Sequence, residues 1–306
     1  VVTVLLLTEL KHTFTEFAQR MKNDEMITLA KFLAISGIIL PMLPHKNLIP
    51  DINLTPYSIW LATVVVSGIS YLSYLLKRYV FHESGTLVSG IIGGLYSSTA
   101  TISVLARKSR KASELEATDY VAAMLLAVSM MFLRFMILIL IFSREIFLSI
   151  YPYLLTMAVV AAIVAWFIHS RQKRPEDQPA ETEEDDSSNP LEFKVALIFA
   201  VLFVIFTFLT HYTLVYAGTG GLNLLSFVSG FSDITPFILN LLQNTGSVAA
   251  LIITACSMQA IISNIIVNMF YALFFAGKGS KLRPWILGGF GVVITCNLVL
   301  LLFFYI

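Results

Sequence analysis

Charged side chains are scarce in this sequence. They make up 13% of its 306 residues, about half of the share that a soluble globular chain carries. Hydrophobic residues reach 57%, and so few charges cannot cover a surface of this size in contact with water. The net charge of +1 gives no reason to expect nucleic acid or another polyanion as a partner.

Cysteines and catalytic motifs are equally sparse. Both cysteines, Cys256 and Cys296, lie inside apolar runs, where a small buried residue is expected rather than a disulfide or a metal ligand. The sequence contains no HExxH zinc pair, no GxxxxGK[ST] phosphate loop and no GxSxG elbow. We therefore expect neither an enzyme nor a covalently bound cofactor.

Long apolar runs dominate what is present. Seven of them are each long enough to cross the hydrocarbon layer of a membrane. They cover residues 26–43, 57–76, 120–142, 146–168, 195–216, 248–275 and 285–306. The sequence therefore predicts an all-α integral membrane protein whose first partner is the lipid bilayer.

Three segments lie outside these runs. Residues 1–10 resemble the tail of a transmembrane helix that starts further upstream. Residues 11–25 carry apolar side chains at helical spacing, which predicts either a helix along the membrane surface or a soluble connector, so that 11–56 forms a connector plus one span. The acidic stretch 171–191 predicts a disordered linker, the alternative being an acidic metal-binding loop.

Two further segments, 85–106 and 221–242, are long enough to cross a membrane but contain Gly, Ser, Thr, Asn and Asp. Placing Gly85 on Gly221 at a constant offset also brings together Gly94 with Gly230 and Thr99 with Thr235, among others. Each segment follows one apolar span and precedes two, which predicts an internal repeat. In the following span the register stays open, because VAAMLLAVSM and VAALIITACSM align at a different offset.

Basic residues decide between two topologies, because short cytoplasmic loops retain Lys and Arg. If both polar segments enter the membrane and return to the same face, sixteen of the eighteen basic loop residues lie inside, and Lys46 and Arg144 lie outside. If both segments cross fully, the same residues divide nine and nine. The count favours two inverted-topology repeats, 57–170 and 192–306, each with three spanning helices and a re-entrant broken helical hairpin. The acidic linker is then cytoplasmic, and the hairpin tips meet near the midplane.

The two tips could carry chemistry, because broken backbone at membrane depth needs protein or water to satisfy it. Glycines allow close approach there, and hydroxyls surround one carboxylate, which is a hard-oxygen environment suited to Na⁺, K⁺ or Mg²⁺. The alternative is that these small residues only let helices pack closely. The glycines are Gly93, Gly94 and Gly230, and the candidate pathway residues are Ser97, Ser98, Thr99, Thr101, Ser232, Asp233 and Thr235, with Asp233 as metal ligand.

Two polar residues inside spans extend the candidate site. Arg134 could neutralise Asp233 or line the same cavity, or it could extend outward to the membrane interface near Arg144. Asn264 could line the pathway or form a hydrogen bond between helices, as could the neutral residues His211, Gln259 and Asn268.

The segments GLYSSTATISVLARKSR, MFLRF, GLNLLSFVSGFSDIT and SNIIVN resemble the uncharacterised membrane domain that follows an MgtC/SapB-type domain in many prokaryotic proteins. The resemblance covers the chain from about residue 13 to its end. It implies a prokaryotic inner membrane, an MgtC-like domain upstream of residue 1 and a link to Mg²⁺ homeostasis. The chain departs from the family at Thr235, where similar proteins often carry a second acid, and at Asn268, where they often carry Lys.

The leading hypothesis is a channel or secondary transporter that conducts an inorganic cation, Mg²⁺ or a monovalent ion, between the hairpin tips, with Asp233 as its electrostatic anchor. The first alternative is a regulatory or scaffold membrane protein that moves nothing. The second is a lipid or small-solute carrier with a wide apolar cavity that reaches the membrane. The sequence leaves the oligomeric state open, and a homo-oligomer is compatible with it.

Overall fold

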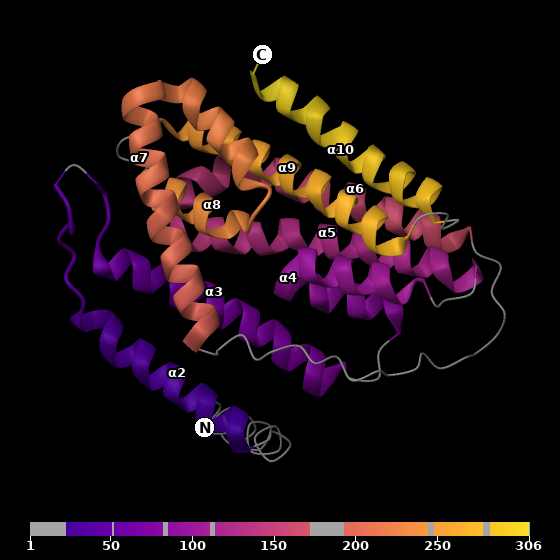
Figure 1. The fold of residues 1–306 in the computed structure, drawn as a ribbon, viewed down its shortest axis with the longest axis horizontal. Coiled ribbons are helices and arrows are strands. Elements are labelled where there is room, and N and C mark those ends of the chain that lie inside the picture. Colours follow the sequence, from indigo (N-terminus) through magenta and orange to yellow (C-terminus); the bar gives the residue numbers. More distant parts are fainter. Residues whose placement is uncertain are drawn as a thin grey trace, which may run out of the picture.

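The computed structural model describes residues 23–50, 52–81, 85–110, 114–171, 193–243, 248–277 and 282–305, and within these ranges every extended regular element is a helix. The predicted tail 1–10, most of the predicted connector and nearly all of the predicted acidic linker lie outside the described residues. The helices, drawn in Figure 1, are α2 Asn23–Met42, α3 Pro56–Leu75, α4 Thr86–Lys108, α5 Glu114–Phe142, α6 Arg144–Ser170, α7 Phe193–Ser229, α8 Ile234–Gln243, α9 Ala250–Ala276 and α10 Arg283–Tyr305.

Eight of the described helices are long and apolar enough to cross a membrane. Each of the seven predicted spans is confirmed as a helix, and the protein is an all-α, multi-pass membrane protein. The outer face of α6 carries exposed Leu155, Val159, Ile163 and Trp166. Such side chains are expected where lipid rather than water surrounds a helix.

Local chemistry sets where the helices begin. At the start of α3, the Thr55 hydroxyl accepts the backbone N–H of Ser58 at 2.9 Å, and the Ser58 hydroxyl accepts the N–H of Thr55 at 3.1 Å. This capping box satisfies two N–H groups that lack helical partners, and Pro56 follows at a position where its missing N–H costs nothing. The far end of α3 continues into a short π-helical turn, Leu76–Val80.

The core forms where small residues let helices approach closely. Ala122, Ala123 and Ala127 on α5 are fully buried, and helices α4 and α6 both pack against α5. Helix α9 is the most enclosed of the described spans and contacts α4, α6, α7, α8 and α10. Polar residues such as Asn264 and Asn268 on α9 are therefore held inside the protein, not at its lipid surface.

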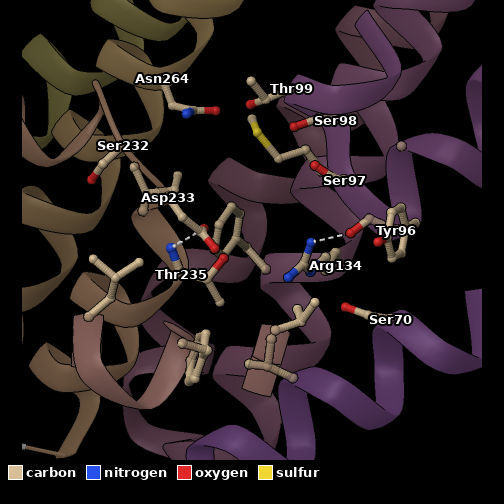
Figure 2. Close-up of a pocket in the computed structure, with 18 of the residues that line it drawn as sticks. Ser70, Tyr96, Ser97, Ser98, Thr99, Arg134, Ser232, Asp233, Thr235 and Asn264 are labelled. Atoms are coloured by element: carbon tan, nitrogen blue, oxygen red, sulfur yellow. Dashed lines mark hydrogen bonds between the residues drawn. The ribbon is translucent and has the colours of Figure 1, made fainter. Parts of the chain in front are cut away.

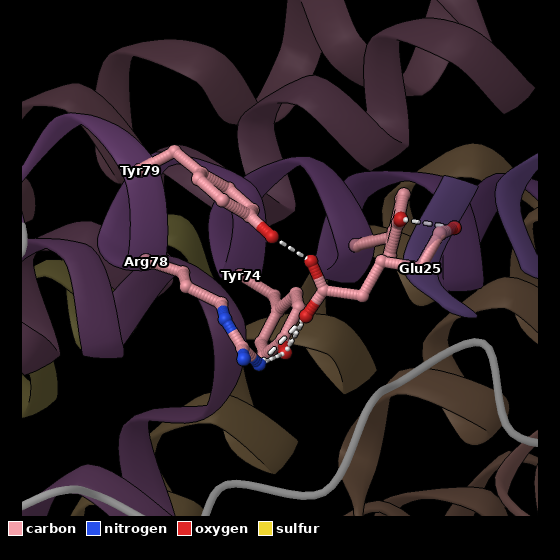
Figure 3. Close-up of polar contacts among 5 residues, drawn as sticks. Glu25, Tyr74, Arg78 and Tyr79 are labelled. Atoms are coloured by element: carbon pink, nitrogen blue, oxygen red, sulfur yellow. Dashed lines mark hydrogen bonds and ion pairs between the residues drawn. The ribbon is translucent and has the colours of Figure 1, made fainter. Parts of the chain in front are cut away.

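Helix α2 lies at the edge of the molecule, beside α3 (Figure 1). A cluster of polar side chains attaches it there (Figure 3). The Glu25 carboxylate pairs with Arg78 at 2.6 Å and accepts hydrogen bonds from the hydroxyls of Tyr74, at 2.7 Å, and Tyr79. Tyr71 donates to the backbone carbonyl of Glu25 at 3.3 Å.

The sequence analysis placed Glu25 at the end of the connector 11–25, one position before the first predicted span, and gave it no partner. Helix α2 already begins at Asn23, and Glu25 is 5% exposed. The reason lies in the partner helix, because the residues that enclose Glu25 are supplied by α3 and by the π-helical turn, about fifty positions away.

Candidate functional site

Helix α4 is two antiparallel arms and not one rod. Ser97 has an extended backbone, with φ −159° and ψ 106°, inside the helix. A Cβ atom added to Gly93 would lie 2.5 Å from Oγ1 of Thr101, although a continuous helix would separate two such positions by about 12 Å along its axis. The chain therefore reverses at Ser97. We call residues 86–108 the first hairpin, and each arm of it reaches roughly 16 Å.

A second reversal follows in the other half of the chain. Helix α7 breaks at Gly218, whose φ of +61° lies in the region that favours glycine. The helix resumes up to Ser229, and a tight turn with hydrogen bonds from the N–H groups of Gly230, Phe231 and Ser232 leads to α8. We call residues 219–243 the second hairpin.

The open ends of the two hairpins contact different helices, the first hairpin at a C-terminal end and the second at an N-terminal end. The first hairpin ends near the last turn of α9, where Arg110 donates to the carbonyls of Phe274, at 3.1 Å, and Phe275. The second hairpin ends near the first turn of α3, where Asn53 donates to the carbonyl of Gln243 at 2.8 Å. Their turns point into the protein interior and reach the same cavity.

At each turn, a glycine lets the backbone pack closely against the helix that follows the hairpin. A Cβ atom on Gly94 would lie 2.5 Å from the Cα of Ala127 on α5, and one on Gly230 would overlap the side chain of Ser263 on α9. Asn264 adds a hydrogen bond from Nδ2 to the Gly230 carbonyl at 3.2 Å. The glycines thus permit an approach between backbones that any larger residue would prevent.

A cavity of about 430 Å³ lies between the two turns. Eight of the predicted pathway residues line it, together with Gly94: Ser97, Ser98, Thr99, Arg134, Ser232, Asp233, Thr235 and Asn264. Thr101 does not line it, because its side chain packs against Gly93 within the first hairpin. Gly93 and Gly230 support the turns from outside the cavity.

The sequence analysis missed several residues of this wall. Helix α3 contributes Ser67 and Ser70, and the first arm contributes Tyr96. Apolar and aromatic side chains complete the lining: Val66, Met131, Phe135, Val195, Ile198, Phe199, Leu202, Phe231, Ile234, Val267 and Tyr271. The spacing of Ser67 and Ser70 on one face of an apolar span was a usable signal for the hydroxyls, whereas nothing in the sequence indicated which aromatic rings meet here.

The two charges of the cavity each complement the end of a hairpin arm (Figure 2). Asp233 accepts the backbone N–H of Thr235 at 2.9 Å and so caps the start of α8. Arg134 donates from Nη1 to the carbonyl of Tyr96 at 2.7 Å, at the end of the first arm. Each charge thus lies at the helix end whose dipole it stabilises.

Arg134 and Asp233 are close without being paired. Among the described residues they form no ion pair within 4.0 Å, yet Asp233 is near enough to interact electrostatically with Arg134. The Nε atom of Arg134 is enclosed and has no hydrogen-bond partner among the described residues. The structure therefore places Arg134 in the cavity beside Asp233, not at the outer surface.

Comparisons with known proteins name a family and no activity. A protein from Aquifex aeolicus (strain VF5), described as "Uncharacterized protein", is 25% identical over 227 residues, which cover 72% of this chain and 96% of that protein. No solved structure gives a significant match. The family model described as "Domain of unknown function (DUF4010)" matches residues 64–276, a range that contains both hairpins and every residue that lines the cavity. The chain belongs to the DUF4010 family.

Proposed function

We propose that this protein is a membrane transporter that moves a small charged solute between the turns of its two hairpins. One observation carries the proposal: both turns, together with Arg134 and Asp233, line a single cavity between helices that are long and apolar enough to cross a membrane. Broken helices and ionisable side chains at membrane depth are costly, and they persist where they form a pathway or a binding site.

We also propose an inverted repeat, an arrangement that suits alternating access to this cavity. Gly94 and Gly230 are separated by 136 positions, and the residues against which they pack, Ala127 and Ser263, are separated by the same 136. This shared offset favours one of the two registers that the sequence left open. We therefore propose that 57–170 and 192–306 are inverted-topology repeats, the arrangement in which transporters place substrates near the midplane.

The two turns also match in chemistry at this offset. Ser97 and Asp233 occupy equivalent positions, and each caps the arm that follows it: the Ser97 hydroxyl accepts the N–H of Ala100 at 3.3 Å, and Asp233 accepts that of Thr235. In this proposal the two repeats form equivalent turns. Only the second turn places a negative charge in the site, because Asp233 stands where the first turn has Ser97.

The distribution of basic residues supports a cytoplasmic orientation for one end of the bundle. Arg107 and Arg110 lie beside the last turn of α9, and Arg171 follows the end of α6. By the positive-inside rule this end faces the cytoplasm. The chain then lies in the inner membrane with its acidic linker on the cytoplasmic side and with the first hairpin entering from there.

Inorganic cations are one class of candidate substrate. The cavity offers one carboxylate and several hydroxyls, but it also contains the guanidinium of Arg134. Among the described residues, no group of three or more His, Cys, Asp or Glu could hold a metal ion. These donors suit a monovalent cation better than Mg²⁺, whose two charges would face a single carboxylate and a like-charged guanidinium.

Flux through purified protein in liposomes tests the proposal. We expect uptake of at least one solute from a panel of Na⁺, K⁺, Mg²⁺ and the twenty amino acids, and we expect Asp233→Asn to slow it roughly tenfold or more, the loss that follows from one charge-assisted contact. Glu145→Gln is the matched control, because Glu145 is an exposed carboxylate outside the cavity. Absence of flux for every solute would overturn the proposal in favour of the regulatory protein linked to Mg²⁺ homeostasis.

A further inference from the structure

We propose that the cavity binds a zwitterion, an α-amino acid with an apolar side chain, whose ammonium group contacts Asp233 and whose carboxylate contacts Arg134. This inference rests on the proposed transport function and names its substrate class. Figure 2 shows the Arg134 and Asp233 side chains reaching toward the middle of the cavity from opposite walls. The geometry points to a ligand that meets both groups at once.

Charge balance is the first argument. Among the described residues that line the cavity, only Asp233 and Arg134 carry a full charge, and they have opposite signs. A bare cation beside Asp233 is repelled by Arg134, and a bare anion beside Arg134 is repelled by Asp233. A zwitterion satisfies both groups and adds no net charge to a site whose other walls are largely apolar.

The unused hydrogen-bonding capacity of Arg134 is the second argument. A guanidinium has five N–H donors in one plane, and this one bonds to the Tyr96 carbonyl through Nη1 while its enclosed Nε has no partner among the described residues. An unsatisfied buried donor is costly. A carboxylate matches the planar geometry of the guanidinium and accepts two parallel hydrogen bonds from it.

Asp233 retains the complementary capacity. Its Oδ1 accepts the N–H of Thr235, whereas Oδ2 has no hydrogen bond to any residue that the structure describes. An ammonium group has three donors, which Oδ2 and hydroxyl oxygens that line the cavity are of the right type to accept. Both ends of an amino acid therefore have partners without any change in the caps of the hairpins.

The size and the walls of the cavity indicate the rest of the molecule. Its volume of about 430 Å³ equals that of roughly a dozen water molecules, far more than one dehydrated ion occupies. Phe135, Phe199, Phe231 and Tyr271 face it alongside aliphatic residues. Such walls stabilise an apolar side chain and leave an isolated ion without partners on most sides.

Charge-deleted ligands test the inference. Each of the twenty amino acids is titrated against purified protein by thermal stabilisation, and the tightest binder is then compared with its methyl ester, which lacks the carboxylate, and its N-acetyl derivative, which lacks the ammonium. We expect Arg134→Gln to weaken the amino acid at least tenfold and the methyl ester little. Asp233→Asn should weaken the amino acid by a similar factor and the N-acetyl derivative little.

Controls separate this inference from the transport function. Arg134→Lys keeps the charge and loses the planar donors, so it should fold and bind with intermediate affinity, and Glu145→Gln should bind as the wild type does. Failure of all twenty amino acids to bind, or an equal loss of every ligand in both variants, would overturn the zwitterion site. If Na⁺ or K⁺ flux still depended on Asp233 in that case, transport would stand and only the substrate class would be wrong.

Discussion

Two pairs of oppositely charged side chains in this protein are built differently. Glu25 and Arg78 form a direct ion pair at 2.6 Å, and tyrosine hydroxyls complete the shell of the carboxylate (Figure 3). Asp233 and Arg134 form no such pair. Each is bonded to the backbone of a hairpin instead, and a cavity lies between them (Figure 2).

The difference separates a structural role from the binding role that we propose. The Glu25 pair is closed, because its charges already satisfy one another and join α2 to α3. The Asp233 pair is open, because backbone groups hold the two charges in place while leaving hydrogen-bonding capacity unused. The second arrangement leaves charged atoms available to a ligand, whereas a direct pair would compete with a ligand for the same atoms.

The largest loss of stability is expected at Gly94, where the first hairpin packs closely against α5. Gly94→Ala should lower the free energy of unfolding by about 3 kcal/mol, because the new Cβ would overlap the backbone of Ala127. Gly68→Ala is the control: nothing lies within 4 Å of its Cβ position, and it should be neutral or stabilising. Unfolding of both variants in detergent measures the difference. Equal stabilities would show that the first hairpin does not depend on this close approach.

Double-mutant cycles compare the two pairs directly. For Glu25→Gln and Arg78→Gln we expect a coupling energy of about 1 to 2 kcal/mol, because removal of the Arg78 charge leaves the largely buried Glu25 carboxylate without its ion-pair partner. For Asp233→Asn and Arg134→Gln without ligand we expect less than about 0.5 kcal/mol, because no direct bond joins them. The free energy of unfolding of the four single variants and two double variants gives both values. A larger coupling at the cavity would mean that the second pair is closed as well.

Hydropathy and polarity patterns in the sequence suffice to locate the spans and the two polar segments. The seven apolar runs become helices because lipid allows no other state for an isolated stretch of backbone. Residues near Ser97 and Asp233 interrupt two helices because glycine and hydroxyl side chains there disfavour a continuous rod. These are properties of short segments, so one sequence is sufficient to predict them.

Pairing between distant segments could not be predicted in the same way. The carbonyl of Tyr96 receives Arg134 only because α4 folds back against α5, and Glu25 is buried only because α3 covers it. The register between α5 and α9 stayed ambiguous because small residues recur along both helices. The contacts of Gly94 with Ala127 and of Gly230 with Ser263, which share one offset, come from the fold and not from the sequence, and they support the repeat that we propose.

The smallest effect on stability is expected at Asp233. Two substitutions there distinguish the contribution of helix capping from that of the negative charge. Asparagine caps a helix about as well as aspartate does, so Asp233→Asn should change the free energy of unfolding by only a few tenths of a kcal/mol, while Asp233→Ala should cost about 1 kcal/mol. Thermal unfolding of the two variants without ligand measures this order. If Asp233→Asn were as harmful as Asp233→Ala, the charge itself would stabilise the fold, as it does at Glu25. A stable Asp233→Asn variant that no longer binds or transports would instead show that the negative charge is kept for a ligand.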